Sequence, residues 1–168
     1  PLPVGGIEPA LAQAGRLWDA YQPVHADWDG LPQIDWREVP HERDAVVWNE
    51  APWTITAAPV DLGDTPNIGL RFRHDPTGNV LAYSCDTAPT ESVVHLAEGA
   101  DVLVHEANGG ESDNHSTATG AARVAKEAGT DRLLLVHLPP GDKSNALKEA
   151  RSIFPHTDLG DELGSYSF

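Results

Sequence analysis

The sequence predicts an α/β fold built around a mixed β-sheet. Between residues 45 and 86, several β-rich segments follow one another with short turns between them, which is typical of antiparallel strands. After residue 86, short apolar segments alternate with segments that carry apolar residues at helical spacing. Because the chain has 168 residues, of which 40% are hydrophobic, we expect a single domain that spans residues 1–168.

The first half of the chain is predicted to contain one helix and three strands. Residues 7–20 (IEPALAQAGRLWDA) place apolar side chains at helical spacing behind a Gly-Gly break. Residues 21–44 are rich in Pro, Asp and Trp without a clean period, so we expect a loop there. The segments AVVWNE (45–50), WTITAAPV (53–60) and IGLRFRH (68–74) are predicted strands.

The second half is predicted to alternate between strands and helices. The turn DPTGN (75–79) should join two strands in a hairpin, and Thr90 should be the N-cap of a short helix. The remaining expected elements are strands at 101–107 and 131–138, helices at 116–129 and 145–154, and an edge strand at 166–168.

Charge and cysteine content limit the partners and the compartment. Eleven basic and 26 acidic residues give a formal charge of −15, which disfavours a nucleic acid as the default partner and is also compatible with a high-salt habitat. The single cysteine, Cys85, excludes an internal disulfide and fits a reducing compartment. No apolar run approaches the ~20 residues that span a bilayer, and the start lacks the features of a signal peptide. We therefore expect a soluble, cytoplasmic protein with no membrane partner.

Polar side chains follow three successive predicted strands, in the segments SCDT, HEANGG and HLPPGD. In open α/β sheets, ligands bind at the carboxyl ends of the strands. We therefore expect Asp86, His105, Glu106 and His137 to share one rim of the sheet, within reach of His115.

Carboxylate and imidazole groups together are typical ligands of zinc and similar cations. Taken singly, these residues have simpler interpretations: Asp86 as a helix cap, His105 and His137 as hydrogen-bonded core histidines, and His115 as the neighbour of an N-cap. Their joint occurrence at successive strand ends favours a metal site. Cys85 is interpreted as an inert residue beside the site and not as a nucleophile.

Residues 83–140 also contain four motifs in a fixed order: YSCDT, HEA, HST opening a helix, and a strand that ends in VH. This segment closely resembles the C-terminal half of metallo-β-lactamase-fold hydrolases, specifically the ribonuclease Z-like branch, where the motifs are Y-S-G-D-T, H-E-A, H-S-T and a strand ending in T-H. The resemblance implies an αββα sandwich of two similar halves with a binuclear metal site between them. This chain would supply mainly the second half and the connecting region.

The resemblance also implies roles for individual residues. Asp86 is similar to the aspartate that bridges two zinc ions, and His137 is similar to the terminal histidine ligand of one of them. His115 is similar to the histidine that stabilises or protonates the phosphodiester, with Glu106 as its orienting carboxylate. His105 and Thr87 would lie behind these residues without touching the metal.

Three positions depart from the family pattern. Cys85 replaces the usual glycine of the Y-S-G-D-T turn, one small residue for another. The main metal motif of the family, H-x-H-x-D-H, does not occur in this sequence. A further histidine ligand is expected near Gly63, where the sequence offers Asp61 and Asp64 as the nearest substitutes. Since a catalytic zinc takes about three protein ligands, Asp86 and His137 alone would not hold two ions.

The sequence therefore predicts a zinc-dependent hydrolase, with manganese or iron as alternative metals, that acts as a phosphodiesterase or a ribonuclease Z-like enzyme. Because the chain starts at Pro1 and contains no methionine, we expect it to be processed, truncated or part of a longer product that supplies the first half. The charge favours a small phosphodiester or ester substrate over transfer RNA, and a homodimer is compatible with the sequence. The alternatives are a catalytically inactive binding or scaffolding protein on the same fold, and a hydrolase of lactones or other esters.

Overall fold

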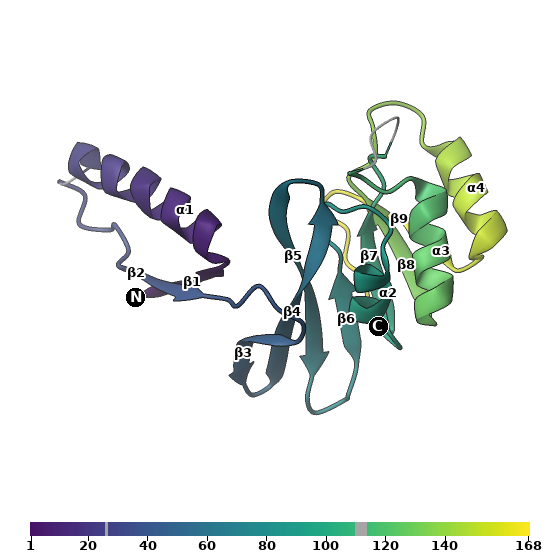
Figure 1. The fold of residues 1–168 in the computed structure, drawn as a ribbon, viewed down its shortest axis with the longest axis horizontal. Helices are drawn as coiled ribbons and strands as arrows, with labels where there is room; N and C mark the ends of the chain where they lie inside the picture. Colours follow the sequence, from purple (N-terminus) through teal and green to yellow (C-terminus); the bar gives the residue numbers. More distant parts are fainter. Residues whose placement is uncertain (26, 110–113) are drawn as a thin grey trace. The chain divides into compact units, whose positions relative to one another are not determined.

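The computed structural model describes residues 1–25, 27–109 and 114–168. The chain forms two compact units, Pro1–His41 and Glu42–Phe168, which are drawn in Figure 1. Each unit is described by itself below. The expectation of one domain over residues 1–168 stays a prediction.

The first unit is a helix with a small parallel sheet. The predicted helix at 7–20 is confirmed as α1 (Glu8–Tyr21), which continues into the short 3-10 helix η1 (Gln22–His25). Strands β1 (Leu2–Gly6) and β2 (Ile34–Glu38) pair in parallel, and neither was predicted. The expectation of a loop throughout residues 21–44 was therefore wrong. Short strands that carry glycine or charged side chains do not show a strong period in the sequence.

The second unit contains a seven-stranded mixed sheet in the order β3-β4-β5-β6-β7-β8-β9. The pairs from β3 to β6 are antiparallel, and those from β6 to β9 are parallel. The strands are β3 (Ala45–Glu50), β4 (Trp53–Leu62), β5 (Thr65–His74), β6 (Val80–Tyr83), β7 (Val102–Glu106), β8 (Arg132–Val136) and β9 (Thr157–Leu159). The predicted α/β class with a mixed sheet is confirmed.

Three helices connect the parallel strands: α2 (Glu91–Ala97), α3 (Ala118–Ala128) and α4 (Ser144–Ile153). Figure 1 shows α3 and α4 side by side next to the β7–β9 end of the sheet. Helix α3 ends at Gly129 as predicted, because this residue adopts a left-handed φ of 66° that suits glycine. None of the described helices is long and apolar enough to cross a membrane.

The core lies between the sheet and these helices. Leu103, Leu133 and Leu135 are fully buried on β7 and β8. They pack in one cluster with α2 and with the alanine-rich face of α3. Gly69 on β5 allows close contact with α2, because a Cβ there would collide with Leu96 and lie 3.1 Å from Val60. Small residues therefore set the spacing between the helices and the sheet.

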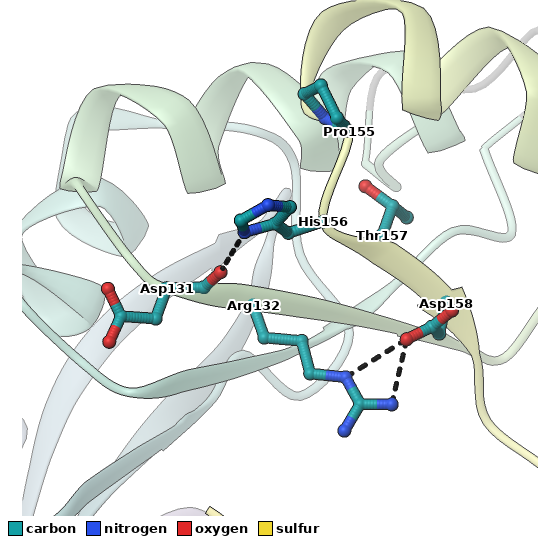
Figure 2. Close-up of a pocket in the computed structure, with 6 residues that line it drawn as sticks. All are labelled: Asp131, Arg132, Pro155, His156, Thr157 and Asp158. Carbon is teal, nitrogen blue, oxygen red and sulfur yellow. Dashed lines mark hydrogen bonds and ion pairs between the residues drawn. The ribbon is translucent and has the colours of Figure 1, made fainter.

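The edge of the parallel part is β9, and the expectation of an edge strand at 166–168 was wrong. The terminal residue instead accepts a hydrogen bond at its carbonyl oxygen from Asn79 Nδ2, at 2.6 Å. At the start of β8 and β9, Arg132 donates two hydrogen bonds to Asp158, at 3.0 and 2.7 Å, beside a pocket of about 310 Å³ that Figure 2 shows. This pocket lies at the amino ends of the parallel strands, away from the polar residues that follow their carboxyl ends.

Candidate metal centre

Three side chains meet at the carboxyl ends of the parallel strands. Asp86 lies in the loop after β6, His137 follows β8 directly, and His115 precedes α3. Each offers one ligand atom, and these atoms all lie within 4.8 Å of one another. His137 Nδ1 is 2.9 Å from Asp86 Oδ1, and the two imidazole rings are 5.7 Å apart between centroids. The structure therefore brings together the three predicted residues that suit a metal ion.

The carboxylate of Glu106 organises the surrounding loops. It is 1% exposed, and its Oε1 accepts hydrogen bonds from the main-chain N–H groups of Ser116 at 2.8 Å and Thr87 at 3.2 Å. His115 Nδ1 lies 3.0 Å from the same oxygen, and Asn108 N donates to Oε2 at 2.7 Å. A carboxylate at Nδ1 selects the tautomer that carries the proton there, so Nε2 of His115 is the nitrogen left for other partners.

The turn that carries Asp86 has an unusual backbone. Cys85 adopts a φ of 55°, in the left-handed region that favours glycine. The thiol is not poised for nucleophilic chemistry, because burial, and secondarily the nearby Asp86 charge, raise the pKa of Cys85 to about 11. This supports the interpretation of Cys85 as inert. The glycine of the family motif corresponds to a position where the backbone conformation suits glycine.

Hydrogen bonds hold this turn from several sides. The Ser84 hydroxyl donates to the Cys85 carbonyl at 2.6 Å, and Asn67 Nδ2 donates to the Asp86 carbonyl at 2.9 Å. The Ser116 hydroxyl donates to the carbonyl of Thr87 at 2.8 Å. Backbone strain persists at functional sites when surrounding contacts fix it. The turn meets this condition.

His137 resembles Cys85 in its backbone, with a φ of 49°. Its side chain lies between Asp86, 2.9 Å from Nδ1, and Asn108, whose Nδ2 is 3.4 Å from Nε2. Sequence reasoning missed Asn108 and Ser116, because an isolated Asn or Ser gives no signal of such a role.

His105 does not join the other residues at the rim, so this part of the prediction was wrong. Neighbouring residues on a strand point to opposite faces, and Glu106 takes the face toward His115. His105 is fully buried, with Nδ1 2.8 Å from the Glu106 carbonyl oxygen and with no partner for Nε2 among the described residues. Burial is the main cause that lowers the pKa of His105. It is a core histidine, which was one of the interpretations open in the sequence, and its role behind the metal ligands, like that of the buried Thr87, stays a prediction.

The turn near Gly63 adds no ligand to this cluster. Asp61 Oδ1 accepts a hydrogen bond from Gly63 N at 3.0 Å, and Thr87 Oγ1 donates to the Asp61 carbonyl at 3.1 Å. A Cβ at residue 63 would lie 2.7 Å from Asn114 Nδ2, so the Asn114 side chain occupies that space. Within the described part of the chain, neither Asp61 nor Asp64 belongs to the group that suits a metal ion.

The donor set fits one divalent ion. One carboxylate and two imidazoles match the three protein ligands of a catalytic zinc site, which keeps a position open for water or substrate. A second ion would need ligands from outside this group. The cluster is thus compatible with a metal centre that is completed by other groups.

A mixed sheet, with helices between its parallel strands and this donor set at their carboxyl ends, defines an α/β protein with a candidate metal centre. The chain belongs to the family described as the beta-lactamase superfamily domain, whose model matches residues 9–138. The resemblance to metallo-β-lactamase-fold proteins is thereby confirmed.

Individual relatives agree with this assignment. The chain is 46% identical over 115 residues to ribonuclease Z of Brevibacillus brevis. The aligned region covers 59% of this chain and 36% of that protein. The chain thus spans about a third of the length of the curated relatives it matches. Among solved structures, the metallo-β-lactamase-fold protein YhfI of Bacillus subtilis matches with a TM-score of 0.72 and 25% identity, over 95% of this chain and 62% of that one. The short form of human tRNase Z matches with a TM-score of 0.73 and 16% identity, over 99% and 68% respectively, which shows a shared fold.

Proposed function

We propose that this chain contributes to the active site of a metal-dependent phosphodiesterase of the ribonuclease Z-like branch. The observation that carries the proposal is the buried Glu106 carboxylate, which holds His115 at 3.0 Å next to Asp86 and His137. The arrangement combines a metal-binding pair with an imidazole of fixed tautomer. The 46% identity to a ribonuclease Z over this region supports it.

The residues have distinct chemical tasks in this proposal. Asp86 and His137 would hold zinc, with manganese or iron as alternatives, and the bound ion would supply a Lewis acid that activates water and neutralises charge on the phosphoryl group. His115 would give its Nε2 proton to the leaving oxygen as the bond from phosphorus to that oxygen breaks. Glu106 would stabilise the imidazolium that precedes this transfer, since it faces Nδ1. His115 as a third metal ligand is the competing assignment within the same geometry.

The proposed substrate is an RNA phosphodiester. The curated relatives are ribonucleases, which argues against the preference for a small substrate that the charge suggested. A small phosphodiester remains the second candidate, because 26 acidic residues against 11 basic ones disfavour contact with an RNA backbone. A cytoplasmic location, a second zinc ion and a homodimer stay parts of the proposal.

The test uses the natural protein that carries this sequence. Metal content would be measured for the wild type, Asp86→Ala and His137→Ala, and hydrolysis of a precursor transfer RNA, an aryl phosphodiester and a lactone would be compared. Metal should fall in both variants, and RNA should be the preferred substrate. Unchanged metal content and unchanged hydrolysis in both variants would overturn the site assignment. A wild type that binds no metal would favour the scaffolding alternative.

The role of His115 is tested separately. His115→Ala should lower kcat/KM by about 10²–10⁴-fold and retain the metal, as expected for the loss of a general acid. His95→Ala, which removes a half-buried histidine on α2 outside the candidate site, serves as the matched control. Loss of the metal in His115→Ala would instead identify His115 as a ligand.

A further inference from the structure

We propose that Asn67 is a positioning residue that holds the Asp86 turn in the geometry needed to bind the metal. The inference rests on the proposed metal site at Asp86 and adds a residue from the antiparallel part of the sheet. Asn67 lies on β5, paired with Val60 of β4, while Asp86 follows β6. It acts on Asp86 through the backbone and touches neither substrate nor metal.

The two ends of the Asn67 amide are each engaged in a way that fixes its orientation. Its Oδ1 accepts a hydrogen bond from Ile68 N at 3.0 Å, and its Nδ2 donates to the Asp86 carbonyl at 2.9 Å. A flipped amide would place NH₂ against N–H and oxygen against a carbonyl oxygen. Asn67 thus links the β5 backbone to the carbonyl of the candidate ligand with one defined donor and one defined acceptor.

The turn needs such a link because its conformation is unfavourable by itself. Cys85 is a non-glycine residue with a φ of 55°, directly before Asp86. Ser84 holds the carbonyl of Cys85 at 2.6 Å, and Glu106 holds the N–H of Thr87 at 3.2 Å. Asn67 supplies a bond to the intervening residue. The Asp86 carbonyl and the Thr87 N–H belong to one peptide group, so Asn67 and Glu106 hold its two ends, and loss of Asn67 lets this peptide rotate toward a less strained conformation.

Rotation of that peptide would redirect the Asp86 side chain. The carboxylate now lies 2.9 Å from His137 Nδ1, which keeps the two candidate ligands within the reach of one ion. Partners that orient ligands from outside the coordination sphere change metal affinity by about 10–100-fold when they are lost. We expect a loss in that range for Asn67.

The experiment titrates Zn²⁺ against a competing chelator in the natural protein that carries this sequence. The variants are Asn67→Ala and Asn67→Leu, of which the second keeps the approximate volume and lacks the donor. The matched control is Asn79→Ala, because Asn79 Nδ2 also donates to a carbonyl oxygen, that of Phe168 at 2.6 Å, away from the site. Both Asn67 variants should bind Zn²⁺ at least tenfold more weakly, and Asn79→Ala should bind it within twofold of the wild type.

A Co²⁺ absorption spectrum and urea unfolding of the metal-free proteins accompany the titration. A changed Co²⁺ spectrum in a folded Asn67→Leu protein indicates altered ligand geometry, which a purely structural role would not produce. Wild-type affinity and spectrum in Asn67→Leu would overturn the inference, as would an equal loss in Asn79→Ala. If Asp86→Ala itself leaves the affinity unchanged, the proposed metal site fails, so the two failures are distinguishable.

Discussion

Replacing Cys85 by glycine should make the protein more stable than replacing it by alanine. Both substitutions remove the thiol, whose pKa of about 11 keeps it neutral at pH 7, so neither removes a charge. They differ at the backbone. An L-residue in the left-handed region costs about 1–2 kcal/mol relative to glycine, and the φ of 55° at Cys85 lies in that region.

The size of the difference follows from three contributions. Glycine relieves the left-handed strain, but it loses about 0.5–1 kcal/mol through the greater freedom of its unfolded chain. Burial of half of the methyl group stabilises the alanine variant by roughly 0.4 kcal/mol relative to the glycine variant. The free energy of unfolding of Cys85→Gly should therefore exceed that of Cys85→Ala by about 0.4 kcal/mol, and by about 1.1 kcal/mol at most.

Urea unfolding of the two variants side by side, at equal m-value, measures this difference. Thermal unfolding should agree, with Cys85→Gly melting about 1–2 °C above Cys85→Ala. Alanine at least 0.5 kcal/mol more stable than glycine would refute the claim that the Cys85 backbone is strained, because relief of that strain is the contribution that favours glycine.

Three further predictions concern buried residues. Glu106→Gln should destabilise the protein by about 2–4 kcal/mol, because one main-chain N–H then faces an amide NH₂ in a buried site. Urea unfolding measures this loss, and a value below about 1 kcal/mol would contradict the prediction. His105 has a pKa lowered by burial, so the unfolded chain takes up its proton first as pH falls below about 6.5 and stability decreases. The free energy of unfolding should therefore fall less for His105→Gln than for the wild type between pH 7 and 5. Equal decreases in the two proteins would count against a lowered pKa of His105. Gly69→Ala should cost about 1–3 kcal/mol by thermal unfolding through its collision with Leu96, whereas Gly15→Ala, where a Cβ would meet nothing within 4 Å, should not destabilise the protein.

The parallel part of the fold was predictable from the sequence because several local signals agreed. Apolar runs marked β7 and β8, Gly129 marked the end of α3, and the 75–79 turn marked the hairpin before β6. The small strands β1, β2 and β9 were missed, since each is held by pairing with a distant partner and not by its own pattern. The terminal YSF segment has strand propensity, but β9 occupies the edge of the sheet.

The convergence of Asp86, His115 and His137 was predictable because parallel strands place their carboxyl ends on one edge. The position of His105 was not, because the sequence did not show which face of β7 each of two adjacent polar residues takes. Asn67 and Asn108 were missed because they act through hydrogen bonds of their amide groups, and such contacts have no sequence pattern. The roles of these residues became visible only from their positions in the structure.

The arrangement around Glu106 also has a consequence for the motion of the site. The amides of Thr87, Asn108 and Ser116 come from two connections, the one after β6 and the one between β7 and α3, yet all donate to one buried carboxylate. Hydrogen exchange at any of them requires its bond to this carboxylate to open. Since exposure of the carboxylate to water frees the three amides together, they should exchange with deuterium at one common rate. The parts of the two connections that carry these amides would then open as a single cooperative unit.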